Sequence, residues 1–246
     1  MNILNITSLD DLKKNSNIIK SLVSQNGSVL IRGLFDNKTI RNVIPKIFSS
    51  LDSSKLIGTT CGDSNLPRRN SFKWSVGGYT GAQIGNARLM IIAYNPLNAP
   101  DVFDFHNQFQ RLIAIRDVIG GDGNSTNDDN LNGNSFNACR FQIYPSGGGF
   151  MLGHKDYIAE ETSLYNGAPL LQLLLFVTER GKDFSEGGAY IINSGNELDI
   201  ESYAQSGDIA IYNGQSFHGV KDIDPFMPLC TQKIRGRVVA LVTIYK

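Results

Sequence analysis

The chain has 246 residues, of which 23 are lysine or arginine and 23 are aspartate or glutamate, so its formal net charge is zero. A balanced charge excludes strong global attraction to phosphate backbones or anionic membranes, and we expect neither nucleic acid nor a membrane as partner. Hydrophobic residues make up 41% and the glycines are dispersed, which excludes a disordered or collagen-like chain and favours one globular domain over residues 1–246.

The first part of the chain predicts two helices around a short strand. A helix is expected over residues 8–23, because Ser8 can cap it and apolar residues recur on one face. A β-branched run at residues 29–31 predicts a strand. A second helix is expected from Asn37, with Pro45 as a candidate kink.

Residues 52–85 are rich in glycine, serine and asparagine and predict a long loop. It contains Trp74, the one tryptophan, together with Arg68, Arg69 and Lys73. Aromatic and basic residues in a long loop are typical of a lid or substrate wall, and a plain solvated connection is the alternative. We therefore treat these four residues as candidate substrate-binding residues.

The middle of the chain predicts one strand and one helix. The strand is expected over residues 88–94 and the helix over 101–118, with His106 inside it as a structural or surface histidine. Residues 120–137 are almost entirely turn formers and polar residues, so we expect a polar excursion there and not a strand.

The second half of the chain alternates short β-rich runs with turn signals. This spacing predicts a sandwich or open barrel, so the fold class is mainly β with flanking helices, an α+β arrangement. The expected strands cover residues 138–144, 151–157, 169–178, 188–193, 208–212, 216–220 and 237–245.

Three residues in this half could hold a metal. His154 and Asp156 are two apart, so on an extended chain both side chains point to one face of a strand. His218, on a distant strand, would complete two imidazoles and one carboxylate with open positions opposite them. This set suits a divalent iron, although a histidine near a strand end is often an ordinary core or surface residue.

The order of the surrounding segments adds to this set. Residues 138–246 contain, in this order, the segments CRFQIYPSGGGFMLGHKD, SEGGAYI, SGDIAIYNGQSFHGV and GRVVALVTIY. This order resembles the 2-oxoglutarate and iron(II)-dependent oxygenase superfamily. The resemblance implies a double-stranded β-helix (jelly roll) supported by N-terminal helices. It also implies that iron(II), 2-oxoglutarate and O2 are used to hydroxylate a substrate, with His154, Asp156 and His218 as the metal ligands.

The resemblance also implies residues for 2-oxoglutarate. An arginine at the start of the last strand would bind its far carboxylate, because the planar guanidinium pairs bidentately with a carboxylate. Arg237 leads directly into that strand, and Arg235 is the alternative. Tyr144 matches a cosubstrate-binding tyrosine and Gln142 would face the same side, with core packing as the alternative for both.

We expect a cytoplasmic enzyme acting on a small molecule such as an amino acid or specialised metabolite. The first residues place acids where a signal peptide needs apolar residues. Cys61, Cys139 and Cys230 have neither disulfide nor zinc spacing, so they are expected to be reduced. A cupin-like metal-binding isomerase and a non-enzymatic binding protein are the alternatives, and the oligomeric state is left open.

Overall fold

The computed structural model describes residues 1–52, 66–77, 87–120, 136–156 and 171–245. Within these residues the strands form one continuous, strongly bent sheet, in which the hydrogen-bonded order is β1-β2-β10-β7-β12-β5-β4-β6-β11-β8-β9 and β3 pairs with β4. The strands are β1 (Ile3–Asn5), β2 (Ser28–Arg32), β3 (Ser71–Gly77), β4 (Arg88–Tyr94), β5 (Phe136–Pro145), β6 (Gly149–His154), β7 (Leu171–Phe176), β8 (Gly188–Asn193), β9 (Asn196–Asp199), β10 (Ile209–Asn213), β11 (Phe217–Ile223) and β12 (Gly236–Tyr245).

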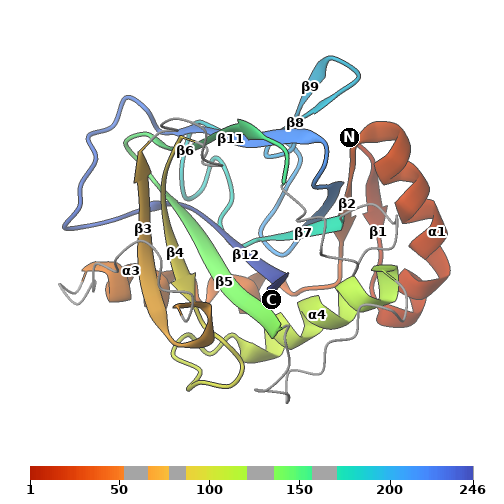
Figure 1. Cartoon of the computed structure of the whole chain (residues 1–246), viewed down its shortest axis with the longest axis horizontal. Coiled ribbons are helices and arrows are strands. Elements are labelled where there is room, and N and C mark those ends of the chain that lie inside the picture. The colour runs from red at the N-terminus through yellow and green to blue at the C-terminus, as the bar shows by residue number, and fades with distance from the viewer. Residues whose placement is uncertain (53–65, 78–86, 121–135, 157–170, 246) are drawn as a thin grey trace.

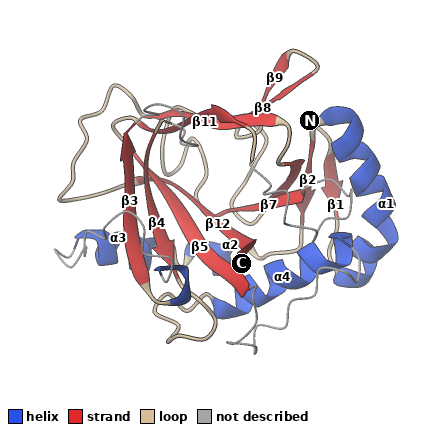
Figure 2. Cartoon of the chain, viewed as in Figure 1, coloured by secondary structure: helices blue, strands red, loops and turns tan. Residues whose placement is uncertain are grey.

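Strand β4 connects the two layers into which this sheet bends. It pairs with β5 over Ile91–Tyr94 and with β6 at Arg88 and Leu89. Figure 1 shows β6, β8 and β11 across the top of the molecule, with β7 and β12 below them. The sheet therefore has an inner side between the layers and an outer side, which the helices cover on the lower layer (Figure 2). The fold class expected from the sequence, mainly β with flanking helices, is confirmed.

The helices lie outside the lower layer (Figure 2). They bury a large apolar core against the sheet, which includes Leu12 and Ile19 of α1 and Phe109 and Leu112 of α4. No described helix is both long enough and apolar enough to cross a membrane. The helices are α1 (Leu9–Asn26), α2 (Asn37–Arg41), α3 (Ile44–Asp52), the short 3-10 helix η1 (Leu66–Arg68) and α4 (His106–Gly120).

Local chemistry explains where the helices begin and end. Ser8 caps α1, since its hydroxyl accepts the Asp11 backbone N–H at 3.1 Å. Gly27 ends that helix in the left-handed conformation, at φ 78°. The single helix expected from Asn37 is instead two helices, α2 and α3. Pro45 lies in the first turn of α3, where its missing N–H costs no hydrogen bond.

The prediction of a loop over residues 52–85 is wrong for residues 71–77, which form β3 and pair antiparallel with β4. Phe72 and Trp74 alternate with Ser71, Lys73 and Ser75, which is a strand pattern that the neighbouring glycine-rich stretches obscure. The rest of that expected loop, apart from η1, and residues 121–135 of the expected polar excursion lie largely outside the described residues. Cys61 also lies outside them.

Candidate metal and cosubstrate site

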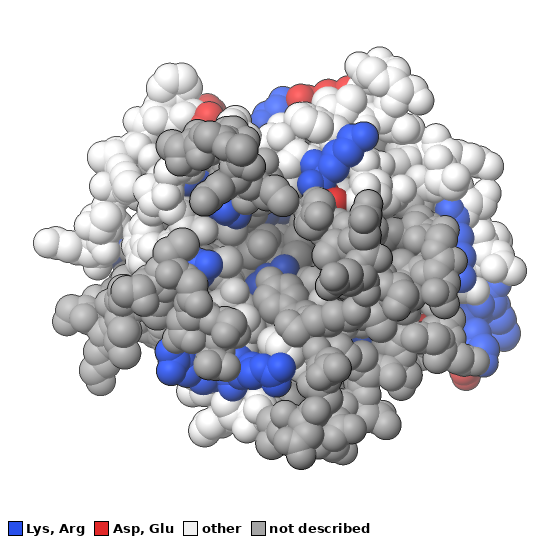
Figure 3. Space-filling view, viewed as in Figure 1, with Lys and Arg blue, Asp and Glu red and all other residues white. Residues whose placement is uncertain are grey.

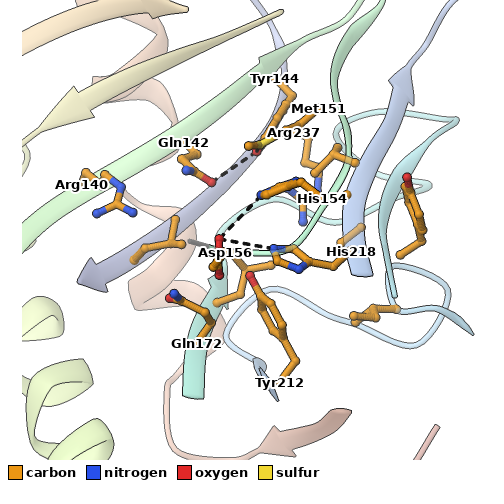
Figure 4. A pocket seen from close by; sticks show the side chains of 17 residues that line it. Arg140, Gln142, Tyr144, Met151, His154, Asp156, Gln172, Tyr212, His218 and Arg237 are labelled. Carbon is orange, nitrogen blue, oxygen red and sulfur yellow. Dashed lines mark hydrogen bonds and ion pairs between the residues drawn. The ribbon is translucent and has the colours of Figure 1, made fainter. Parts of the chain in front are cut away.

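His154, Asp156 and His218 come together between the two layers of the sheet. His154 is the last residue of β6, Asp156 follows two residues later, and His218 on β11 lies opposite His154 in the antiparallel register. The Asp156 Oδ1 atom is 3.6 Å from His154 Nε2 and 3.8 Å from His218 Nε2. One potential ligand atom from each residue lies within 4.8 Å of the others, a spacing that one metal ion can bridge (Figure 4).

Backbone contacts place a hydrogen on Nδ1 of both imidazoles. His154 Nδ1 lies 3.0 Å from the Leu152 carbonyl oxygen, and His218 Nδ1 lies 2.8 Å from that of Ser216. A carbonyl oxygen can only accept, so in each ring Nδ1 carries the proton and donates it. In a neutral ring with the hydrogen on Nδ1, the Nε2 lone pair is free to bind a metal, and both Nε2 atoms lie within 4 Å of Asp156 Oδ1.

Burial affects the pKa of His218, and backbone hydrogen bonds hold the segment that carries Asp156. Desolvation lowers the pKa of His218 below its ordinary value, although Asp156 acts in the opposite direction, so the ring is neutral at pH 7. The Asp156 backbone N–H donates to the Gly214 carbonyl at 2.7 Å, and the Gln215 side chain donates to the Asp156 carbonyl. The turn between β10 and β11 therefore fixes the chain that carries the carboxylate.

Arg237 lies in the same pocket, on β12, and its whole residue is 0% exposed. Its Nε donates to Glu201 Oε2 at 2.9 Å. Among the described residues, neither of its terminal nitrogens, Nη1 and Nη2, has a hydrogen-bond partner. Buried guanidinium N–H groups without partners are costly. A carboxylate placed against this edge would satisfy both at once, so the residues present fit a cosubstrate that carries a carboxylate at one end.

Tyr144 and Gln142, both on β5, line the same pocket as Arg237 and the triad (Figure 4). The Tyr144 hydroxyl donates to Gln142 Oε1 at 3.2 Å. Burial raises the pKa of Tyr144 to about 12, so the hydroxyl keeps its proton near pH 7. It is a permanent hydrogen-bond donor at this position.

Comparison with known proteins identifies the fold. No family model and no curated protein matches the sequence. Among solved structures, a Trichoplax adhaerens prolyl hydroxylase in complex with a hypoxia inducible factor peptide is 13% identical, with a TM-score of 0.57, over 95% of this chain and 91% of that one. The chain has the fold of the 2-oxoglutarate and iron(II)-dependent oxygenases.

Two further structures support this assignment. A Pseudomonas putida prolyl-4-hydroxylase is 13% identical, with a TM-score of 0.51, over 92% of this chain and 97% of that one. An oxidoreductase of the 2OG-Fe(II) oxygenase family from Burkholderia pseudomallei is 12% identical, with a TM-score of 0.50, over 99% and 96%. The likeness therefore covers nearly the whole of this chain and of these oxygenase chains.

Arg235, the alternative 2-oxoglutarate ligand, lies elsewhere in this oxygenase fold. Its guanidinium carbon is 5.0 Å from the centre of the Phe48 ring on α3. Gly236, between the two arginines, has a φ of 140°, which interrupts the alternation of a regular strand. Arg235 and Arg237 therefore do not point the same way, and of the two only Arg237 lines the pocket.

The four candidate substrate residues are also outside the described lining of the pocket. Arg68 stacks on the Phe136 ring, with its guanidinium carbon 3.8 Å from the ring centre. Arg69 is exposed, Lys73 lies opposite Ile92 in the β3–β4 pair, and Trp74 packs against the helix-side core.

Residues not singled out from the sequence also line the pocket. Arg140, Gln172 and Tyr212 line the pocket together with the triad (Figure 4). Arg140 is two residues before Gln142 on β5, so the strand alternation that places Gln142 and Tyr144 on one face also predicts Arg140 there. Gln172 and Tyr212 are directly opposite each other on β7 and β10, a pairing that only the fold reveals.

Proposed function

We propose that the protein is an oxygenase that uses iron(II), 2-oxoglutarate and O2 to hydroxylate a small molecule. The observation that carries this proposal is the pairing, in one pocket, of a two-histidine, one-carboxylate triad with a buried arginine whose terminal nitrogens have no described partner. When bound, the iron and 2-oxoglutarate supply the oxidising chemistry, in which O2 is reduced while 2-oxoglutarate is converted to succinate and carbon dioxide.

The residues of the chain would hold and orient these groups. His154, Asp156 and His218 give the metal two neutral nitrogens and one negative charge, which leaves it able to accept an anionic cosubstrate. Arg237 would bind the far carboxylate of 2-oxoglutarate through Nη1 and Nη2. The Tyr144 hydroxyl, held protonated by burial, would exchange its hydrogen bond to Gln142 Oε1 for one to the same cosubstrate.

The remaining polar wall of the pocket gives the proposed substrate class. Arg140 pairs with Leu241, and Tyr144 with Arg237, so the two arginines are four residues apart along the β5–β12 ladder. Four residues of strand span roughly 13 Å. Arg140 therefore occupies a separate position from Arg237 along the pocket wall. With Gln142 and Gln172, it favours a small substrate that carries a carboxylate or amide, such as an amino acid derivative.

The lysine and arginine distribution agrees with an anionic substrate. The face seen in Figure 3 is hollowed near its centre, and lysine or arginine side chains show in and beside this hollow. The net charge of the chain is zero, so this is a local feature of the face and not a general basic character.

Succinate formation tests the proposal. Protein loaded with iron(II) is supplied with 2-oxoglutarate, air and, one at a time, free amino acids, their amides and their neutral analogues. We expect one or more carboxylate- or amide-bearing compounds to stimulate succinate formation. Asp156→Ala should abolish it, while His106→Gln, at the one histidine outside the site, should preserve it. Metal binding without succinate formation from any compound would contradict the proposal and favour the cupin-like alternative.

A further inference from the structure

Glu201, the buried ion-pair partner of Arg237, is not among the residues proposed to touch the metal, the cosubstrate or the substrate. Glu201 follows β9, and its side chain and that of Arg237 are each 1% exposed. A buried ion pair contributes little net stability, because the cost of desolvating two charges offsets their attraction. A role beyond stability is therefore worth seeking for this glutamate.

We infer that Glu201 is a positioning residue for 2-oxoglutarate, because it holds the Arg237 guanidinium so that Nη1 and Nη2 face the far carboxylate. This inference rests on the proposed function. Glu201 would then determine how strongly the site prefers 2-oxo acids that have a second carboxylate over those that lack one.

The geometry of the guanidinium carries the inference. The planar group offers two edges to a carboxylate, one through Nε and Nη2 and one through Nη1 and Nη2. Glu201 Oε2 accepts the Nε hydrogen at 2.9 Å, which engages the first edge at its inner end. The edge formed by Nη1 and Nη2, whose atoms have no partner among the described residues, is then the one left for an incoming carboxylate.

Glu201 is itself held by the neighbouring strand. The same Oε2 atom accepts the Ala189 backbone N–H of β8 at 2.9 Å, and the Ile200 N–H donates to the Ala189 carbonyl at 2.9 Å. A carboxylate oxygen fixed by a backbone N–H cannot follow the arginine if the arginine moves. The rigid strand therefore sets the orientation of Arg237.

Space for this carboxylate depends on Gly188. A Cβ at this position would lie 2.5 Å from Glu201 Cγ, 2.6 Å from its Cβ and 2.9 Å from its Cδ. Gly188 also has a φ of 122°, which side-chain-bearing residues rarely adopt. Gly188 thus makes room for the buried glutamate.

Aromatic contacts fix the remaining freedom of Arg237. Its guanidinium carbon is 5.4 Å from the centre of the Tyr144 ring and 5.6 Å from that of Phe176. These rings limit how far the guanidinium can move, while the hydrogen bond to Glu201 fixes the direction of its Nε–H. The arginine is therefore oriented before any cosubstrate binds, which reduces the ordering cost of binding.

Two variants separate position from charge. Glu201→Gln keeps the length and an oxygen acceptor but loses the charge. Glu201→Asp keeps the charge but is one methylene shorter, so its carboxylate cannot contact both Ala189 N–H and Arg237 Nε. Each is titrated without oxygen, as the iron(II) protein, with 2-oxoglutarate and with 2-oxopentanoate, which has a methyl group in place of the far carboxylate.

The ratio of the two dissociation constants is the readout, because a general disturbance of the pocket would weaken both ligands alike. We expect wild type and Glu201→Gln to prefer 2-oxoglutarate by similar factors, and Glu201→Asp to lose about tenfold or more of this preference, with iron(II) affinity unchanged in all three. Full preference in Glu201→Asp, or a loss in Glu201→Gln alone, would overturn the positioning role. No preference in wild type would instead contradict the proposed function.

Discussion

The two faces of strand β5 carry different side chains, and the difference separates stability from function. Phe141 and Ile143 face the helices and belong to the large apolar core. Arg140, Gln142 and Tyr144 alternate with them and line the pocket between the layers. The backbone is common to both sets, so the contrast arises entirely from the side chains.

Strand β12 repeats the contrast. Val238 and Ala240 are fully buried in the helix-side core, whereas Arg237 is equally buried on the pocket side, where two of its nitrogens have no described partner. Each unpaired buried polar group costs about 1–3 kcal/mol. The helix-side core offsets this cost, and violations of ordinary packing rules of this kind are typical of functional sites.

The largest expected effect comes from substituting a residue of the metal triad in the pocket. His218→Ala removes one of three ligands, and we expect complete loss of iron(II) binding. Iron(II) added without oxygen should then raise the Tm of wild type and of His106→Gln but not of His218→Ala, because only a bound ligand stabilises the folded state. An equal Tm shift in His218→Ala would show that the metal binds elsewhere.

The second substitution alters the core on the side of β5 that faces the helices. Phe141 is fully buried and makes edge contacts with Phe103 and Phe105, at ring-centre distances of 5.4 Å and 4.9 Å. Phe141→Ala should lower the free energy of unfolding by about 3–5 kcal/mol, measured by denaturant titration. Phe226→Ala, at a side chain that is 91% exposed, is the control and should change it little. A loss below about 1 kcal/mol for Phe141→Ala would contradict the account of this core.

A smaller effect is expected from substituting Arg237, which also lines the pocket. Arg237→Lys keeps the positive charge but cannot present two parallel donors, so one charge-assisted hydrogen bond to 2-oxoglutarate is lost. We expect the affinity for 2-oxoglutarate to fall roughly ten- to a hundredfold. Calorimetric titration measures this loss, and Arg235→Lys provides the matched control with unchanged affinity. Equal losses in the two variants would contradict the assignment of the cosubstrate to Arg237.

The smallest effect concerns a helix end on the outer side. Ser8→Ala removes the acceptor for the Asp11 N–H and should lower the free energy of unfolding by about 1 kcal/mol. Binding of 2-oxoglutarate should not change, since α1 does not line the pocket. Thermal unfolding and a 2-oxoglutarate titration of the same variant check both statements, and weakened binding would show that the two faces are coupled.

Sequence reasoning reached the features that local patterns encode. Short β-rich runs between turn signals predict β5, β7 and β12 closely, and the two-residue spacing of His154 and Asp156 predicts that both side chains point to one side of the chain. It missed β3, where glycine-rich stretches hide a seven-residue alternation. It also kept Arg235 as an alternative to Arg237, and only the structure shows that Arg235 lies at the Phe48 ring and outside the pocket lining.

The parts that could not be predicted depend on contacts between distant segments. Glu201 is 36 residues before Arg237, and only the sheet order brings β8, the segment after β9 and β12 together around it. Gln172 and Tyr212 meet through the β7–β10 pairing in the same way. The candidate substrate residues chosen from composition, such as Trp74, are not among the described lining residues of this pocket, and composition does not say which way a side chain faces.

The most direct test of the central claim is the absorption of the chelate that iron(II) forms with 2-oxoglutarate. Wild-type protein with iron(II), kept free of oxygen, should develop a weak visible charge-transfer band when 2-oxoglutarate is added. His106→Gln should develop the same band, and His154→Ala should show none. Absence of the band in the wild-type protein, or its persistence in His154→Ala, would contradict the claim that this triad holds iron for 2-oxoglutarate.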